Sequence, residues 1–175
     1  MNKLTNKVKE DLLEFRRAQD ALASHYEKTE NREMAYLVRW SILERFVKVV
    51  ATEYRLDLLR NSLNEWLAHI ENGKPRPSKN PKFSIEVNTL PKKQEFIKAL
   101  HYYGFNGTDV WAVMDSRGKH RRHRNELAHT GKKFINMALY QMLYGDLIKT
   151  SEMIFALIES NKAGEPDGNK SGGLR

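Results

Sequence analysis

The chain has 175 residues, no cysteine, and a formal net charge of +8 from 30 Lys and Arg against 22 Asp and Glu. This length suits one domain with a sizeable core. The absence of cysteine excludes disulfides, thiol catalysis and zinc sites built on thiolates. No apolar run is long enough to span a bilayer, and the charged first turns show no signal peptide. We therefore expect a soluble, cytoplasmic protein.

The positive charge is concentrated in two stretches. Residues 74–93 carry a net charge of +5 and residues 117–133 a net charge of +6, which leaves −3 for the rest of the chain. Clustered Lys and Arg on an otherwise acidic body are typical of a protein that meets a polyanion. For residues 74–93, a loop that merely keeps the protein soluble explains the charge equally well.

The N-terminal part of the chain has helical periodicity. Helical spacing over residues 5–28 predicts a helix with one apolar face, formed by Val8, Leu12, Phe15, Leu22 and Tyr26. Residues 31–72 contain no Gly or Pro and predict either one long helix or two helices with a break near residues 52–57. We favour two, because such a long helix without a coiled-coil heptad is unusual in a compact domain.

A Pro-rich basic loop follows. Four of the five prolines lie between residues 75 and 91, which ends the helical pattern. Within the loop, residues 83–87 alternate in polarity and could form one short extended piece without an obvious partner strand.

The helical pattern returns in the C-terminal part. It predicts helices over residues 92–103 and 108–116, the second with Thr108 as N-cap. Further helices are expected over residues 118–130 and 133–160, with Gly131 ending the first of them.

These elements predict an all-α fold. We expect a single domain over residues 1–161, an up-and-down bundle of four to five main helices with the Pro-rich basic loop. The Gly-rich residues 162–175 predict a flexible C-terminal tail.

The stretch KHRRHRNELAHTG, residues 119–131, carries the most chemical information. Each residue of a helix advances about 100°, so Arg121, Asn125 and His129 share one face. Arg124 lies close enough for its long side chain to reach the same site. An Arg fork that binds phosphate and a His that exchanges protons at neutral pH suit phosphodiester cleavage without a metal.

Other interpretations of the same residues stay open. The stretch could be a solvent-facing basic helix end. A metal site on His120 and His123 is disfavoured, because Glu126 is the one carboxylate at ligand spacing and neighbouring Arg residues repel a cation. We expect neither metal nor cofactor. A DNA-binding regulator is a further alternative, although no helix-turn-helix spacing is visible. Several aromatic residues could stack on bases or belong to the core: Tyr102, Tyr103, Phe105 and Trp111.

Two short patterns resemble one known family. Arg124-Asn125-x-x-x-His129 is similar to the R-N-x-x-x-H motif of the HEPN superfamily (higher eukaryotes and prokaryotes nucleotide-binding domain), in its ribonuclease-type members. Residues 41–48, SILERFVK, resemble the apolar-Glu-x-Phe-x-Lys stretch of an early helix in many bacterial members. The predicted all-α order over residues 5–160 is also similar. Gly131 stands where some toxins of the superfamily carry a Tyr, so control by modification of that Tyr cannot apply to this chain.

The resemblance implies a homodimer whose two motif helices face each other and form one composite site. That site would cleave RNA without a metal, leaving a 2′,3′-cyclic phosphate and a 5′-hydroxyl, as in toxins and anti-phage abortive-infection effectors. By the same resemblance, Arg124 would stabilise the charge on phosphorus, His129 would exchange protons, and Asn125 would orient His129 or the phosphate. Glu44 is a candidate polar partner from the earlier helix, although it forms an ordinary i, i+4 pair with Lys48 equally well.

We expect the remaining basic and imidazole side chains of this stretch to contact RNA: Lys119, His120, Arg121, Arg122, His123, Lys132 and Lys133. An antitoxin or regulatory protein is a possible further partner. The alternative is a non-catalytic HEPN-like module that binds RNA, a nucleotide or a protein.

Overall fold

The computed structural model describes residues 3–73, 86–105, 108–115 and 118–160, and these residues form helices and their connections without a strand. The helices are α1 (Asn6–Lys28), α2 (Arg32–Glu71), α3 (Lys93–Tyr102), α4 (Thr108–Met114), α5 (Lys119–Thr130) and α6 (Met137–Ser160). Five of them have ten residues or more, and α4 has seven. The predicted all-α fold with four to five main helices is confirmed.

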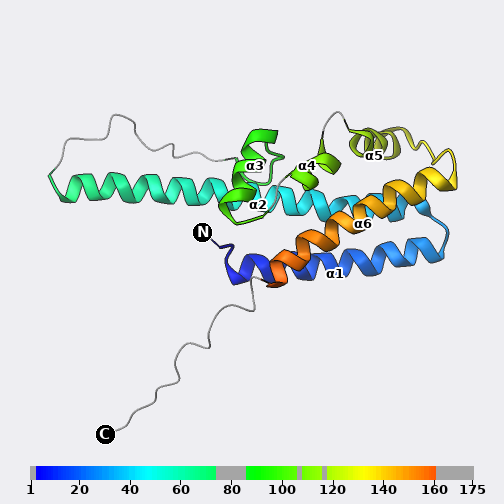
Figure 1. The fold of residues 1–175 in the computed structure, drawn as a ribbon, viewed down its shortest axis with the longest axis horizontal. Coiled ribbons are helices and arrows are strands. Elements are labelled where there is room, and N and C mark those ends of the chain that lie inside the picture. Colours follow the sequence, from blue (N-terminus) through cyan, green and yellow to red (C-terminus); the bar gives the residue numbers. More distant parts are fainter. Residues whose placement is uncertain (1–2, 74–85, 106–107, 116–117, 161–175) are drawn as a thin grey trace, which may run out of the picture.

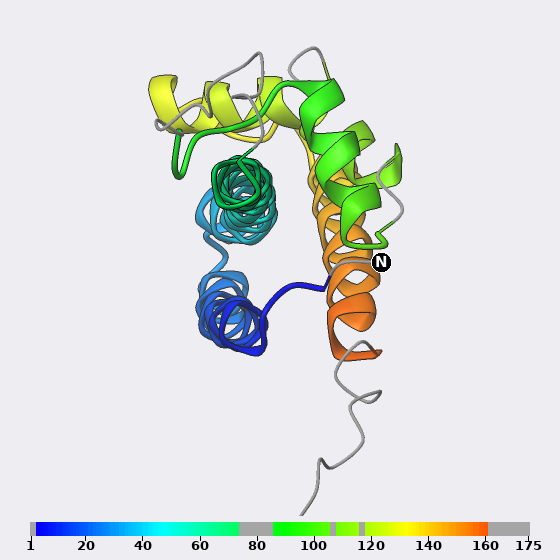
Figure 2. The same cartoon turned by 90° about the vertical axis from the view of Figure 1, so that its left-hand side faces the viewer.

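The helices are arranged around the first half of α2 (Figure 1). Helix α1 lies antiparallel beside α2, and α6 runs obliquely along both. Helix α5 lies on the side of α2 away from α1 and crosses it, as the view along α2 shows (Figure 2). The core forms where these helices meet, around fully buried Tyr36, Phe46 and Phe155. Burying such aromatic side chains is the main force that holds the helices together.

Helix α1 uses part of its predicted apolar face. Leu12 is 2% exposed and packs in the core, whereas Leu22 is 39% exposed. The helix begins where the hydroxyl of Thr5 accepts a hydrogen bond from the amide of Val8, at 3.3 Å. This satisfies one of the backbone donors that every helix leaves free at its start.

The predicted break near residues 52–57 is wrong, because α2 is one helix of 40 residues. Contacts from the chain segment that follows support it at that point. Arg55 donates to both carboxylate oxygens of Glu95, at 2.6 and 3.0 Å, and to the Thr89 hydroxyl at 2.8 Å. The Tyr103 hydroxyl donates to Asp57 at 2.9 Å. These bonds hold the region of α3 against the middle of α2, which no local pattern could reveal.

Helix α6 begins at Met137, four residues later than predicted. The side chain of Asn136 caps it by accepting a hydrogen bond from the amide of Leu139, at 2.8 Å. Before it, the amide of Phe134 donates to Glu33 at 3.1 Å, and the ring of Phe134 packs edge-on against Tyr36. These contacts tie residues 132–136 to the start of α2 in a non-helical connection.

Three predictions fall wholly or partly outside the described residues. They are the C-terminal tail, most of the basic loop and most of the extended piece, of which Glu86 and Val87 are described and lie in no strand. None of the helices in the described ranges is long and apolar enough to cross a membrane.

Candidate functional site on helix α5

Helix α5 has well-defined ends. Gly118 is its N-cap in an extended conformation, and Gly131 is its C-cap with a φ of 64°. That φ lies in the left-handed region, where a residue without a Cβ is favoured, so the predicted helix stop at Gly131 is confirmed. The two ends fix how far the basic stretch remains helical and place His129 in its last turn.

Arg124 joins α5 to α2 through Glu44. Its Nη2 atom lies 3.3 Å from Oε2 of Glu44, and its Nη1 atom donates to Oδ1 of Asn125 at 3.1 Å. The Arg124 side chain is 30% exposed and that of Glu44 is 18% exposed. Two of the residues predicted to act together, 80 positions apart in the chain, are therefore in direct contact.

Glu44 is itself held by neighbours on α2. The indole nitrogen of Trp40 donates to Oε2 at 2.9 Å, and Nζ of Lys48 lies 2.8 Å from Oε1. Burial by itself would raise the pKa of the Glu44 carboxyl, but the hydrogen bonds from Lys48 and Trp40 and the charges of Lys48 and Arg124 lower it below its ordinary value. Glu44 is thus an ionised anchor for Arg124 and not a source of protons.

Asn125 and His129 lie on the open side of α5. Both side chains are exposed, and in the described part of the chain His129 makes no hydrogen bond or ion pair. Ala128, also exposed, lies one helical step from them, next to the half-buried Arg121 at i, i+7. This outer face of α5, defined by Arg121, Asn125, Ala128 and His129, is open to a ligand or to another protein.

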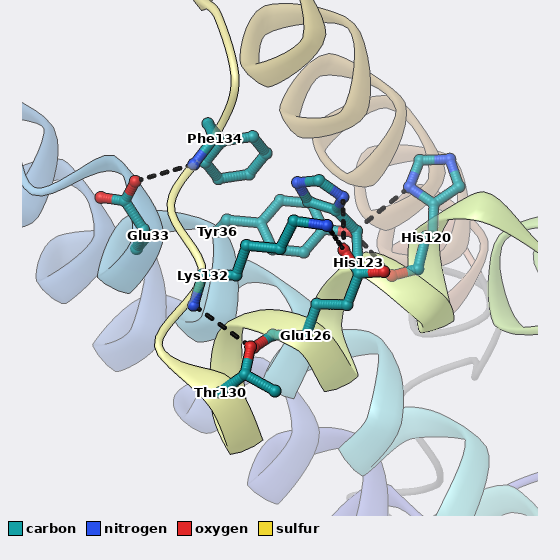
Figure 3. Close-up of polar contacts among 8 residues, drawn as sticks. All are labelled: Glu33, Tyr36, His120, His123, Glu126, Thr130, Lys132 and Phe134. Carbon is teal, nitrogen blue, oxygen red and sulfur yellow. Dashed lines mark hydrogen bonds and ion pairs between the residues drawn. The ribbon is translucent and has the colours of Figure 1, made fainter.

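The inner face of α5 is formed by His120, His123 and Leu127, at i, i+3 and i+7. Figure 3 shows both histidines turned toward Tyr36. His120 is 3% exposed, and its Nε2 atom lies 3.1 Å from Oδ2 of Asp146. The hydroxyl of Tyr36 donates to the carbonyl oxygen of His120 at 3.1 Å.

His123 packs among aromatic rings. Its ring centroid lies 4.7 Å from that of Phe134 and 6.3 Å from that of Tyr36 (Figure 3). Burial lowers the pKa of both His120 and His123, against the opposite effect of Asp146 on the first and Glu126 on the second. Both imidazoles are therefore neutral near pH 7 and turned away from solvent, a position that does not favour contact with RNA.

The remaining basic side chains differ in whether they form ion pairs. Lys132 forms an ion pair with Glu126 at 3.1 Å, and Lys119 lies 3.4 Å from Asp146. Arg122 and Lys133 are exposed and form no ion pair among the described residues. Of the predicted contacts, Arg121 and Arg122 lie on α5 at or beside the outer face, and Lys132 and Lys133 follow the end of the helix.

No family model, no curated protein and no solved structure matches the chain.

Two further expectations concern metals and aromatic residues. No group of three or more His, Cys, Asp or Glu side chains that could hold a metal ion occurs in the described ranges. Tyr103 and Phe105 are 2% and 5% exposed and belong to the core, whereas Tyr102 and Trp111 are half-buried at its edge. Base stacking by Tyr103 and Phe105 is thus not supported.

The contact that sequence reasoning missed is Trp40 with Glu44. The i, i+4 spacing of the two residues is a signal that could have revealed it, because such pairs meet on one helix face.

Proposed function

We propose that the protein is a metal-independent endoribonuclease whose active site forms where two copies meet at the outer face of α5. We further propose that it acts in the cytoplasm as a toxin or anti-phage abortive-infection effector, under the control of an antitoxin or other regulatory protein. The observation that carries the proposal is the geometry around Arg124. An anchored guanidinium, an amide and an exposed imidazole lie together on a basic helix.

The chemistry requires one bond to form and one to break. The 2′-oxygen of RNA attacks phosphorus, the bond to the 5′-oxygen breaks, and the products are a 2′,3′-cyclic phosphate and a 5′-hydroxyl. One proton leaves the 2′-hydroxyl and one reaches the 5′-oxygen. His129 is the residue in this proposal that exchanges protons, because an imidazole ring has one nitrogen that can accept a proton and one that can donate it.

Arg124 binds the phosphate. Its bonds to Glu44 and Asn125 use two of its five N–H donors, so the others can reach the non-bridging oxygens. The anchored position means that little side-chain entropy is lost when the phosphate binds. In this role Arg124 stabilises the negative charge that grows on phosphorus during the attack.

A second copy completes the proposed site. One imidazole cannot both accept and donate a proton in a single step, whereas a homodimer brings two. The small side chain of Ala128 on the outer face allows two helices to approach closely. Exposed apolar residues follow directly after α5, with Ile135 75% exposed and Met137 42% exposed. Such exposed apolar residues favour contact with another protein surface.

The proposal is tested with single-stranded RNA in the presence of EDTA. We expect wild-type protein to cleave it, and Arg124→Ala and His129→Ala to lose activity. Arg17→Ala and His101→Ala are matched controls, because both residues are exposed on other helices. Equal activity in all variants, or activity only with added metal, would contradict the mechanism. Specific activity that does not change with protein concentration across the monomer–dimer transition would contradict the shared site.

One observation favours the alternative, a non-catalytic module that binds RNA, a nucleotide or a protein. His129 has no orienting partner within the described residues, whereas a catalytic imidazole is commonly oriented by a second group. This alternative predicts RNA binding that weakens steeply with salt while the RNA stays intact.

A further inference from the structure

A pocket lies at the beginning of α5, away from the outer face. Residues of α4, α5 and α6 line its volume of about 460 Å³. Arg124, Asn125, His129 and Glu44 are not among the lining residues. Lys119 and His120, which we expected from sequence to contact RNA, are among the residues that line this pocket.

The polar side of the pocket is built around Asp146. His120 Nε2 lies 3.1 Å, and Lys119 Nζ 3.4 Å, from the same Oδ2 atom. A carboxylate only accepts, so Nε2 is the protonated nitrogen of the His120 imidazole. Because His120 is 3% exposed and bonded also to Tyr36, this part of the wall is fixed in place.

The charge of the pocket is positive. Asp146 is opposed by Lys119, and Lys149 adds a second ammonium group. Lys149 is exposed and forms no ion pair with any described residue. With His120 neutral, the lining carries one uncompensated positive charge, which would attract an anion. Ammonium groups bind phosphate as point charges without demanding a planar partner.

Apolar side chains also line the pocket. Val113 of α4 and Met153 of α6 are among them. A pocket lined by both charged and apolar side chains favours a ligand that has both kinds of group, since the apolar part removes surface from water while the charge fixes its orientation.

We propose that this pocket binds a small organic phosphate monoester, with the phosphate at Lys119 and Lys149 and the organic group against Val113 and Met153. The ligand is distinct from the RNA of the proposed nuclease site, and the proposal does not depend on that site. A volume of about 460 Å³ exceeds what a bare phosphate ion fills, which is why an organic group is part of the assignment.

The test is calorimetric titration of the full chain with phenyl phosphate, inorganic phosphate and benzyl alcohol. Phenyl phosphate should bind at least about tenfold more tightly than inorganic phosphate, because the ring adds apolar burial. Benzyl alcohol, which lacks the charge, should bind more weakly than phenyl phosphate.

Lys149→Met should weaken phenyl phosphate binding about tenfold, through loss of one charge beside the phosphate. Lys98→Met is the matched control, because Lys98 is an exposed lysine of α3 and its loss changes the net charge equally. Arg124→Ala should leave this affinity unchanged. Equal binding of phenyl phosphate and inorganic phosphate, equal effects of the two lysine substitutions, or loss of binding in Arg124→Ala would each overturn the assignment.

Discussion

Helix α5 carries histidines on two faces with opposite properties. On the outer face, His129 is exposed and has no partner among the described residues. On the inner face, His120 and His123 pack against Tyr36, and burial lowers the pKa of both. The presence of a histidine in a basic stretch therefore does not by itself indicate its role. Its place in the helical turn decides whether it can exchange protons with a ligand or holds the helix to the core.

Arg124 lies at the border between the two faces and links them. Its guanidinium is anchored to Glu44 inside the bundle and hydrogen bonded to Asn125 outside it. The inner face thus holds α5 in position. Arg124, bonded to both Glu44 and Asn125, is in turn fixed relative to the outer face. If this division is correct, substitutions on the outer face reduce activity at little cost in stability, and substitutions on the inner face do the reverse.

The largest expected effect is on cleavage by Arg124→Ala. Removing a group that stabilises charge in the transition state lowers the single-turnover rate about 100- to 1,000-fold. Arg124→Lys keeps the charge but loses the fork that contacts both Glu44 and the phosphate, so it should recover only part of the rate. A cleavage rate for Arg124→Ala within twofold of the wild-type rate would show that Arg124 does not take part in cleavage.

Glu44→Gln should reduce both stability and activity. Loss of its charged hydrogen bonds costs about 1 kcal/mol in the free energy of unfolding, and looser positioning of Arg124 slows cleavage about tenfold. Because the pKa of Glu44 is lowered in the folded state, its stabilising effect is present at neutral pH and is lost as pH falls through that lowered pKa. The wild-type advantage over Glu44→Gln should therefore become smaller as pH falls below the ordinary Glu pKa.

Urea unfolding at neutral pH and at about pH 3, below the ordinary Glu pKa, measures this difference. Glu14→Gln is the matched control, since Glu14 is exposed on α1. An advantage over Glu44→Gln that persists unchanged in acid would show that the ionised carboxylate is not the anchor.

The inner face predicts a second pH dependence. Because the pKa of His123 is lowered on folding, the unfolded chain binds more protons than the folded chain as pH falls below the ordinary His value of 6.5. Wild-type stability should therefore decrease between pH 7.5 and 5.5, as measured by urea unfolding. His123→Phe removes this group and should lose less stability over the same interval. The same loss in both proteins would contradict a buried, neutral His123.

The smallest effect is expected for Arg122→Ala. Arg122 is exposed, so its loss should weaken RNA binding a few-fold and lower the slope of log affinity against log salt by about 1. Arg17→Ala, on α1, should leave the slope unchanged. An unchanged slope for Arg122→Ala would show that Arg122 does not contact the RNA backbone.

Local patterns were sufficient to predict most helices and some of their ends. Helical spacing of apolar residues predicted α1, and a glycine at a favourable position predicted the end of α5 at Gly131. The late start of α6 was missed because the helical pattern already begins at Lys133, whereas the side chain of Asn136 caps the helix three residues later. The continuity of α2 was missed because the bonds of Arg55 to Glu95 and Thr89 bridge segments distant in sequence.

In the candidate site, too, features within one helix could be predicted, whereas contacts between residues far apart in sequence could not. The shared face of Arg121, Asn125 and His129 follows from helical geometry alone. The contact between Arg124 and Glu44 does not, because 80 residues separate them, and the resemblance to a family was needed to suggest it. The inward turn of His120 and His123 was missed although their spacing with Leu127 indicates a buried face.

The most direct test compares His129→Ala with His123→Ala, measuring both the RNA cleavage rate per folded molecule and the free energy of unfolding. We predict that His129→Ala loses nearly all cleavage and keeps wild-type stability. We predict that His123→Ala loses stability and keeps its cleavage rate per folded molecule. The reverse pattern, or cleavage that survives in His129→Ala, would contradict the assignment of the chemistry to the outer face of α5.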